Sequence, residues 1–242
     1  MKRVALVTGA SRGIGAAISE RLGQDGFTVI VTYSGSAAAA QALAAKIEAA
    51  GGTARSVQAD VADAAAVARL FDTAEAAFGG VDVLVNSAGI MKLSPLADTD
   101  DGLVDSLIDV NLKGTVHTLR EAAKRLRNGG RIVNLSTSVV GLKLETYGIY
   151  AATKAAVETL TGILSKELRG RNITVNAVAP GPTATALFLD GKSPELIERM
   201  AKMNPLERLG TPEDIAAAVS FLVGPDGGWI NGQVLRANGG MV

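Results

Sequence analysis

Short runs of apolar residues recur along the chain, and each is followed by a glycine-rich or polar turn. Such runs are typical of strands that lie in a parallel sheet with both faces covered. Between them, apolar residues recur three or four positions apart, which is the spacing of an amphipathic helix. This alternation predicts an α/β domain. Its strands are expected at residues 4–7, 27–31, 54–59, 81–85, 131–135, 173–178 and 233–237.

Helices are expected between these strands. Capping signals support several of them, such as Asp63 before an alanine-rich segment and Thr211-Pro212 before the last helix. The 242 residues are enough for one large α/β domain, which would bury about three quarters of its unfolded surface. We therefore predict a single domain over residues 1–242. The helices are expected at residues 15–22, 36–50, 64–78, 100–126 and 149–168.

The first strand runs directly into the glycine-rich stretch Thr8–Gly15, which opens a helix. Strand, glycine-rich turn and helix in this order are the context that a dinucleotide-binding loop requires, although the spacing departs from G-x-G-x-x-G. The three glycines would permit a tight turn, a close approach of the backbone to pyrophosphate, and close packing of helix on strand. The phosphates would lie at the helix N-terminus. Cofactor contacts are therefore expected at Gly9, Ser11, Arg12, Gly13, Ile14 and Gly15.

The end of the second strand indicates which nicotinamide cofactor binds. NAD-binding proteins usually place an acidic residue there to hold the ribose 2′-hydroxyl, whereas this chain has Tyr33, Ser34 and then Ser36. Arg12 and the two serine hydroxyls could instead receive a 2′-phosphate, although Arg12 alone could equally be a solvated loop charge. We therefore predict NADP(H), with Tyr33 and Ser34 at its adenosine end.

Small and polar residues follow the later strands at the same edge of the sheet. An acidic residue at the end of the third strand could contact adenine. Small residues after the fourth strand let the backbone approach a ligand, and a proline-rich turn with hydroxyls after the sixth is suited to gripping a carboxamide. Further cofactor contacts are expected at Asp60, Val61, Asn86, Ala88, Gly89, Pro180, Gly181 and Thr183.

The candidate chemistry lies on the helix expected over residues 149–168. Tyr150 and Lys154 are four residues apart, so they share one helix face. A phenol has a pKa of about 10, and a lysine cation a few ångströms away can lower it. The fifth strand ends in Ser136-Thr137-Ser138, where a doubly wound sheet places its chemistry. These hydroxyls could also simply bond to nearby backbone.

Two further polar residues lie in the long helical stretch 100–126. Asn111 has low helix propensity and could accept a kink, which would leave its side chain and a freed carbonyl to hold water. His117, the one histidine of the chain, is interpreted as a packed or surface residue because nothing near it in sequence supplies a partner.

Composition narrows the classes of function. The net charge is zero, from 24 basic and 24 acidic residues, so no global field favours nucleic acid or an anionic membrane. The chain has no cysteine, which excludes disulfides, thiolate metal sites and a cysteine nucleophile, and we predict no metal site. No apolar run approaches the roughly 18 residues that span a bilayer. A soluble, cytoplasmic protein is expected.

With these motifs in order, the chain resembles the short-chain dehydrogenase/reductase family over essentially its whole length. The resemblance implies a Rossmann-type, doubly wound sheet of seven parallel strands with helices on both faces, in a homotetramer or dimer. It also implies a catalytic tetrad of Asn111, Ser138, Tyr150 and Lys154. The motifs that carry it are Thr8-Gly9-x-x-x-Gly13-x-Gly15, Asn86-Ser87-Ala88-Gly89, Asn111, Ser138, Tyr150-x-x-x-Lys154 and Pro180-Gly181.

Two positions depart from the family pattern. A serine stands at 87 where the family usually has a second asparagine. Ser138 precedes Tyr150 by twelve residues rather than the commoner thirteen, and Thr137 stands at thirteen. The following Val139-Val140-Gly141 matches the family and favours Ser138, while Thr137 and Ser136 stay open.

The resemblance implies reduction of a ketone by NADPH. Ser138 would bond the carbonyl oxygen, Tyr150 would donate the proton, Lys154 would bind the nicotinamide ribose and lower the Tyr150 pKa, and Asn111 would position a relay water. The closest subgroups look like 3-oxoacyl-carrier-protein reductases and ketoreductases of aryl or cyclic ketones. Carrier-protein docking near Arg125, Arg127 and Arg171 is one possibility. An apolar substrate pocket is expected at Met91, Leu93, Leu144, Glu145, Tyr147 and Leu187, under a lid at 186–210.

Two alternatives stay open. An NAD-linked alcohol or sugar dehydrogenase is opposed by the missing acid after the second strand. A non-catalytic NADP-binding sensor is opposed by the intact Ser138, Tyr150 and Lys154.

Overall fold

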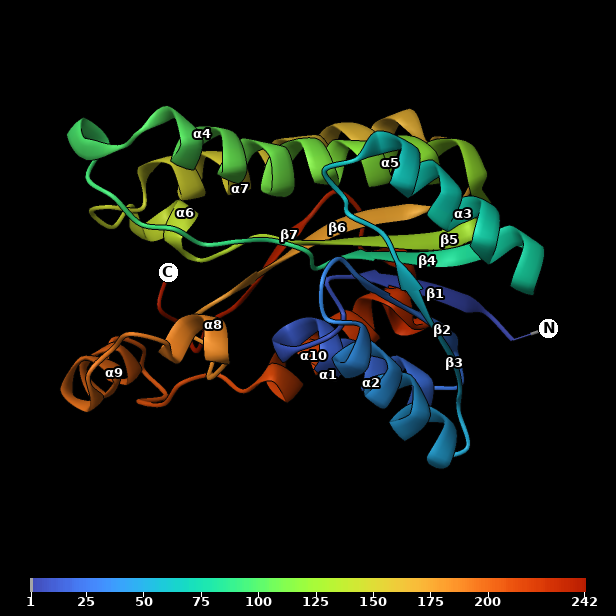
Figure 1. The fold of residues 1–242 in the computed structure, drawn as a ribbon, viewed down its shortest axis with the longest axis horizontal. Helices are drawn as coiled ribbons and strands as arrows, with labels where there is room; N and C mark the ends of the chain where they lie inside the picture. Colours follow the sequence, from blue (N-terminus) through green and yellow to red (C-terminus); the bar gives the residue numbers. More distant parts are fainter. Residues whose placement is uncertain (1) are drawn as a thin grey trace.

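Seven strands form one parallel sheet in the computed structural model, which describes residues 2–242 (Figure 1). Their order across the sheet is β3-β2-β1-β4-β5-β6-β7, so the order reverses between β1 and β4. At such a reversal a doubly wound sheet opens a crevice at the carboxyl ends of its strands. The strands are β1 (Val4–Thr8), β2 (Thr28–Tyr33), β3 (Thr53–Gln58), β4 (Val81–Asn86), β5 (Leu126–Leu135), β6 (Thr174–Pro180) and β7 (Val234–Ala237).

Helices cover both faces of the sheet, as Figure 1 shows. On one face lie α1 (Gly13–Gln24), α2 (Ala37–Ala49) and α10 (Pro212–Val223). On the other lie α3 (Ala64–Phe78), α4 (Asp101–Leu107), α5 (Gly114–Arg125) and α7 (Gly148–Glu167). Each layer buries its own apolar core against the strands, the first around Ile18 and Ile215 and the second around Leu70 and Phe71. The predicted doubly wound α/β fold is confirmed.

Short elements lie beyond the carboxyl edge of the sheet. They are α6 (Val139–Leu142), α8 (Ala186–Leu189) and α9 (Pro194–Ala201). Figure 1 shows α8 and α9 standing off the sheet, away from the two main helix layers. Two 3-10 turns complete the description, at Leu96–Asp98 and Asp226–Trp229.

Six of the seven strands lie within two residues of their predicted bounds, and β5 is the exception. It starts at Leu126, five residues before the predicted start at 131, because Leu126 pairs with Val81 of β4. A register shift between Val81 and Val83 accommodates the longer strand. The apolar run that predicts a strand is interrupted here by two successive glycines, Gly129 and Gly130, so the sequence pattern does not show this part of β5.

The predicted kink at Asn111 is present. The stretch expected as one helix is divided into α4, a π-helical turn at Ile108–Lys113 and α5. A π-turn inserts one residue into the helical ladder, and such turns are frequent at functional sites. The structure therefore places Asn111 in a local departure from α-helical geometry.

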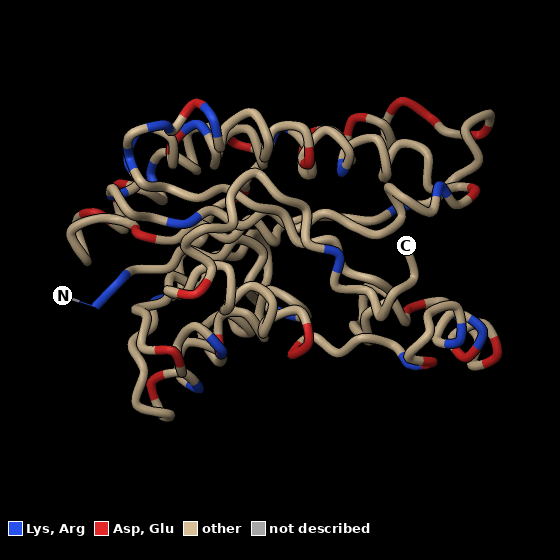
Figure 2. The backbone as a smooth tube through the Cα atoms, turned by 180° about the vertical axis from the view of Figure 1, so that it is seen from behind, with Lys and Arg blue, Asp and Glu red and all other residues tan. Residues whose placement is uncertain are grey.

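Charged residues are concentrated on the helices and loops, with both signs interspersed, while the central strands carry few (Figure 2). Within residues 2–242, no helix is both long and apolar enough to cross a membrane. In the same described part of the chain, no three His, Cys, Asp or Glu side chains gather as they would around a metal ion.

Candidate active site

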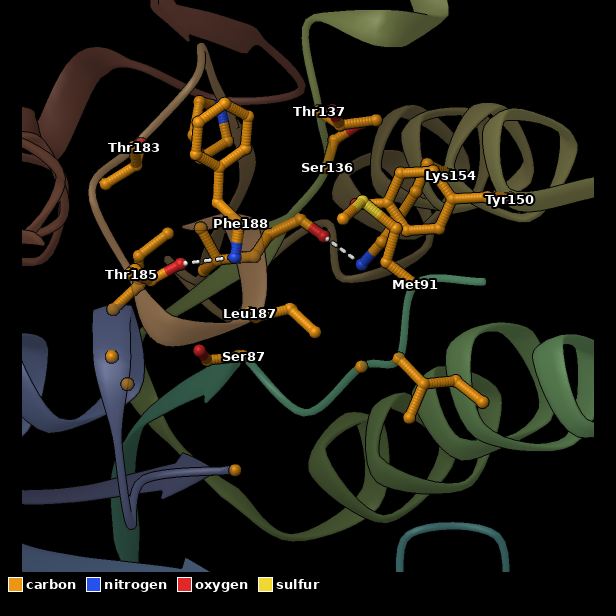
Figure 3. Close-up of a pocket in the computed structure, with 18 of the residues that line it drawn as sticks. Ser87, Met91, Ser136, Thr137, Tyr150, Lys154, Thr183, Thr185, Leu187 and Phe188 are labelled. Atoms are coloured by element: carbon orange, nitrogen blue, oxygen red, sulfur yellow. Dashed lines mark hydrogen bonds between the residues drawn. The ribbon is translucent and has the colours of Figure 1, made fainter. Parts of the chain in front are cut away.

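A cavity of about 420 Å³ opens at the carboxyl edge of the sheet and runs from the glycine turn to Tyr150. Its walls come from the ends of β1, β2, β3, β4, β5 and β6, from α7, and from the α8–α9 region. In Figure 3, Tyr150, Lys154 and Met91 lie on one side of this space, and Thr183, Thr185 and Phe188 on the other. One continuous cavity therefore joins the predicted cofactor loop to the predicted catalytic pair.

The glycine turn fits tightly between its neighbours. Gly9 has φ +61°, and a Cβ added there would lie 2.6 Å from the Ala88 Cα atom. A Cβ at Gly15 would lie 2.5 Å from the Gly9 carbonyl oxygen. The Thr8 hydroxyl accepts hydrogen bonds from the backbone N–H groups of Ser87 and Ala88, both at 3.1 Å. Only glycine fits at the first position, so backbone surfaces form this part of the cavity.

The residues expected to hold the adenosine end of the cofactor lie together at one end of the cavity. Arg12, Tyr33, Ser34, Asp60 and Val61 all line the cavity. Arg12 is exposed, and no ion pair is recorded for it within residues 2–242. The Asp60 carboxylate accepts a hydrogen bond from the Ala62 N–H at 2.9 Å, so it also shapes its own turn.

The turn after β6 closes the cofactor side. Pro180, Gly181 and Thr183, which are expected to contact the cofactor, line the cavity. The Thr183 hydroxyl is buried and donates to the Gly181 carbonyl at 2.9 Å. Thr185, which the sequence analysis did not select, also lines the cavity and caps α8 by accepting from the Phe188 N–H (Figure 3).

Asn86, expected as a cofactor contact, is not among the residues that line the cavity. Its side chain is buried, donates to the Asn134 side-chain oxygen at 2.9 Å, and accepts from the Thr118 hydroxyl at 2.8 Å. Asn134 in turn donates to the Thr161 hydroxyl at 2.9 Å. Asn86 therefore joins β4, β5 and α5, which is a structural role.

Three consecutive residues at the end of β5 meet one face of α7. The Leu135 carbonyl accepts from the Lys154 Nζ at 2.8 Å, and the Ser136 hydroxyl donates to a Glu158 carboxylate oxygen at 2.6 Å. The Thr137 side chain lies close enough to the Tyr150 phenol to lower its pKa. Positions 150, 154 and 158 are four apart, so one helix face takes part in all three contacts.

The three hydroxyls at the end of β5 differ in their contacts, although all of them line the cavity. The Ser138 side chain is 2% exposed, donates to the Ala179 carbonyl at 3.2 Å and accepts from the Asn238 side-chain N–H at 2.9 Å. Ser136 is held by Glu158 in the same way. Of the three, Thr137 is the one whose side chain affects the pKa of the Tyr150 phenol. The thirteen-residue spacing indicated Thr137, while the match of Val139-Val140-Gly141 pointed to its neighbour.

Burial shifts the titration of both helix residues. It raises the pKa of Tyr150 to about 12, and the hydrogen bond with Thr137 offsets only part of this rise. It lowers the pKa of Lys154 to about 8. The expected lowering of the Tyr150 pKa by Lys154 is therefore absent in the protein alone, where the Lys154 Nζ bonds to the Leu135 carbonyl. Tyr150 is a protonated phenol at neutral pH.

Asn111 is fully buried and lies next to Lys154 rather than in the cavity wall. Its side-chain oxygen accepts from the Ile90 N–H at 2.9 Å, and its N–H group donates to the Ile90 carbonyl at 3.0 Å. A Cβ at Gly89 would lie 3.2 Å from the Asn111 side-chain oxygen and 3.5 Å from the Lys154 Nζ. Asn111 thus fixes the segment after β4 beside the lysine, instead of leaving its side chain free for water.

The substrate end is apolar, but its walls differ from the prediction. Met91, Leu144, Tyr147 and Leu187 line the cavity, and the Tyr147 and Tyr150 rings meet edge to face with centroids 6.3 Å apart. Leu93 and Glu145, also expected in the pocket, are exposed and do not line the cavity. Residues missed by the sequence analysis complete the wall: Phe188, Met200, Met203 and Met241.

The arginines that suggested carrier-protein docking are already hydrogen-bonded to other groups of the chain. Arg125 bonds to Glu75 and Asp72 at 2.7 Å each, and Arg127 to Asp82 at 2.9 Å. Arg171 donates to the backbone carbonyls of Ala123 and Leu126. Arg125, Arg127 and the bonds of Arg171 lie where β5 begins, whereas the cavity lies where the strands end.

Comparisons with known proteins agree with this geometry. A family model described as "Enoyl-(Acyl carrier protein) reductase" matches residues 9–242. A Picea abies protein named "Short-chain type dehydrogenase/reductase" is 48% identical over 250 residues, covering 99% of this chain and 92% of the relative. An Arabidopsis thaliana "NADPH-dependent aldehyde reductase-like protein, chloroplastic" is 45% identical over 254 residues, with 99% and 94% coverage.

A solved structure supports the same assignment. The crystal structure of a short chain dehydrogenase from Burkholderia cenocepacia J2315 in complex with NADP superposes with a TM-score of 0.93 at 41% identity, over 99% of this chain and 97% of that one. The sheet order, the glycine turn and the Tyr150–Lys154 face occur together in a chain that these comparisons match over nearly its full length. The chain belongs to the short-chain dehydrogenase/reductase family.

Proposed function

We propose that this protein is an NADP-dependent oxidoreductase that reduces a ketone to a secondary alcohol. The observation that carries the proposal is the placement of Tyr150, Thr137 and Lys154 in the same cavity as the glycine turn. The chain is similar to an NADPH-dependent aldehyde reductase-like protein and to a dehydrogenase crystallised with NADP. Both likenesses support the nicotinamide cofactor and the carbonyl chemistry.

The residues present fit NADP(H). The glycine turn exposes its backbone to the cavity, and no side chain fits at Gly9 because a Cβ there would overlap Ala88. The exposed Arg12 side chain and the Ser34 hydroxyl would bind the 2′-phosphate. No acidic residue stands at the end of β2, where NAD-binding proteins use one to bind the 2′-hydroxyl. Pro180, Gly181 and Thr183 would border the nicotinamide end, with Lys154 on the opposite wall. The bound cofactor supplies hydride to the carbonyl carbon.

The side chains of the protein then act on the carbonyl oxygen. Tyr150 donates its proton there, and burial keeps that proton on the phenol at neutral pH because it raises the pKa to about 12. Thr137 donates a second hydrogen bond to the same oxygen, so the charge that develops is stabilised by two preorganised groups. Lys154 is held by the Leu135 carbonyl, and Asn111 fixes the backbone beside it.

We expect a free small-molecule ketone rather than a carrier-tethered one, because the candidate docking arginines are already paired. We also expect residues 186–210 to act as a lid, since Leu187, Phe188, Met200 and Met203 of this segment line the cavity. A homotetramer or dimer and a cytoplasmic location stay predictions. Light scattering on the purified protein tests the first, and fractionation of the source cells tests the second.

The test is oxidation of NADPH and NADH by the purified protein with a panel of aliphatic, aryl and cyclic ketones and a 3-oxoacyl thioester. Tyr150→Phe should reduce turnover about 10²–10⁴-fold while NADPH binding, followed by its fluorescence, is retained. Equal or better turnover with NADH would support an NAD-linked dehydrogenase. Tight NADPH binding without turnover of any ketone would support the sensor instead.

A further inference from the structure

The substrate half of the cavity is rich in methionine. The chain has five methionines, and four of them line the cavity, while the fifth, Met1, lies outside the described residues. They come from three separate parts of the chain: the segment after β4, the α9 region, and the segment after β7. The four are Met91, Met200, Met203 and Met241.

This half of the cavity is apolar and adaptable. Met91, Met200 and Met241 are half-buried, and Met203 is 44% exposed. Unbranched thioether side chains adjust to irregular ligands and make favourable contacts with aromatic rings. The aromatic rings of Tyr147 and Phe188 line the same space. Such a wall suits a ligand that carries rings.

Within residues 2–242, no charged side chain lines the methionine-lined side; the Lys192 ammonium lies 4.7 Å from the Phe188 ring centroid and donates to the Phe188 carbonyl without lining the cavity. Among the residues that the structure describes, three charged side chains line the cavity: Arg12, Asp60 and Lys154. Arg12 and Asp60 are at the adenosine end, and Lys154 is buried with its Nζ on the Leu135 carbonyl. A carboxylate or phosphate on the substrate would find no cation in the methionine-lined wall, so an uncharged ligand is favoured.

Met241 is held in place by a complete hydrogen-bond network around Asn238. The Asn238 amide donates to the Ser138 hydroxyl at 2.9 Å and to the Val242 carbonyl at 3.3 Å. Its oxygen accepts from the N–H groups of Gly240 at 3.0 Å and Met241 at 3.2 Å. Every donor and acceptor of this amide is therefore used.

This network joins the segment to the sheet. Ser138 donates to the Ala179 carbonyl at the end of β6, and Val242 packs so closely on Gly141 that a Cβ there would lie 2.7 Å from its side chain. The buried Ser138 hydroxyl thus anchors the turn that presents Met241 to the cavity.

We propose that the methionine-lined half binds bulky, uncharged, ring-bearing ketones, and that Met241 is a specificity-determining residue positioned by Asn238 and Ser138. The proposal rests on the proposed reductase function, and it names the substrate class. Tyr150 and Thr137 act on any ketone that enters, whereas Met241 acts only on one large enough to reach it.

The kinetic test compares a small aliphatic ketone with an uncharged bicyclic aryl ketone, both with NADPH. Met241→Ala and Asn238→Ala should lower kcat/KM for the bicyclic ketone about tenfold or more, through KM, and leave the small ketone unchanged. Leu96→Ala is the control, because Leu96 is 72% exposed and does not line the cavity. Equal losses on both ketones, or none on the bicyclic one, would overturn the role of Met241.

A binding test keeps the proposal separate from the reductase activity. Protein labelled with ¹³C at the methionine methyl groups gives few resonances, which single Met→Leu variants assign. The bicyclic ketone should shift the methyl signals of Met91, Met200, Met203 and Met241, and a carboxylate-bearing analogue should not. Loss of all ketone turnover with these shifts intact would sink the reductase function alone. If the enzyme reduces the bicyclic ketone but none of the four methionine methyl signals shifts when that ketone binds, the inference is refuted.

Discussion

The two halves of the cavity are built in different ways. In the cofactor half the ligand surface is backbone: Gly9 stands against Ala88, the Thr8 hydroxyl holds the N–H groups of the β4 exit, and Gly181 lies against Asn238. In the substrate half it consists of side chains such as Met91, Leu187 and Met200, which come from separate segments. The first half has one shape, and the second can adapt.

The difference follows from what each half must recognise. A dinucleotide is the same in every turnover, so a surface fixed by strand ends and a helix N-terminus loses little conformational entropy on binding. A wall of thioethers and leucines accepts several shapes at the cost of ordering long side chains. Rigid backbone and adaptable side chains meet at Tyr150, where Thr137 and Lys154 also converge.

The largest effect is expected where the two halves meet. Thr137→Val keeps the shape of the side chain but removes the hydroxyl beside the Tyr150 phenol, so kcat should fall about 10²–10³-fold, the usual cost of one donor to a developing oxyanion. Ser138→Ala should leave turnover of a small ketone close to wild type, because its hydroxyl is bound to Ala179 and Asn238. Steady-state kinetics of both variants decides the matter. The reverse ranking would restore Ser138 as the catalytic hydroxyl.

The sequence was most informative about the part of the cavity whose surface is formed by backbone atoms. The turn around Gly9 and the strand ends were placed from glycines and apolar runs, because those residues are constrained locally. Met241 could not be found, because it reaches the cavity through Asn238, Ser138 and the sheet edge, contacts that only the fold brings together. The contacts of Asn86 are of the same kind, because its side chain joins β4 to β5 and α5, which only the fold brings together.

A backbone change should damage the cofactor half. Gly9→Ala places a Cβ at φ +61° and 2.6 Å from the Ala88 Cα, so left-handed strain and overpacking together should cost about 2–4 kcal/mol. Denaturant unfolding and NADPH titration measure how this cost divides between folding and binding. Gly162→Ala is the matched control, because nothing lies within 4 Å of a Cβ there. If Gly9→Ala behaves like the control, the backbone surface is not tight.

Arg12 is the exception that sharpens the comparison, because here a side chain does the recognition in the rigid half. Arg12→Gln should weaken NADPH binding by about 1.5–3 kcal/mol, the worth of hydrogen bonds to a charged group, and leave NADH binding unchanged. Calorimetric titration with each cofactor measures the difference. Equal losses for both cofactors would mean that Arg12 supports the turn rather than the 2′-phosphate.

The smallest effect concerns Lys154, buried between the halves. Its ordinary pKa is 10.5, and burial lowers it to about 8, so between these values the unfolded chain holds a proton that the folded protein has lost. The stability of the protein without cofactor should therefore rise with pH, by about 1.5 kcal/mol between pH 8 and pH 9.5. Tyr150, with a pKa of about 12, does not titrate in this window. Denaturant unfolding of wild type and of Lys154→Met is measured across this pH range. The variant lacks the titrating group, so the difference between the two unfolding free energies removes the contributions of the other titrating groups. Parallel stability curves would show that Lys154 keeps its charge in the folded protein, and the fixed cation expected from the sequence would then be present before any cofactor binds.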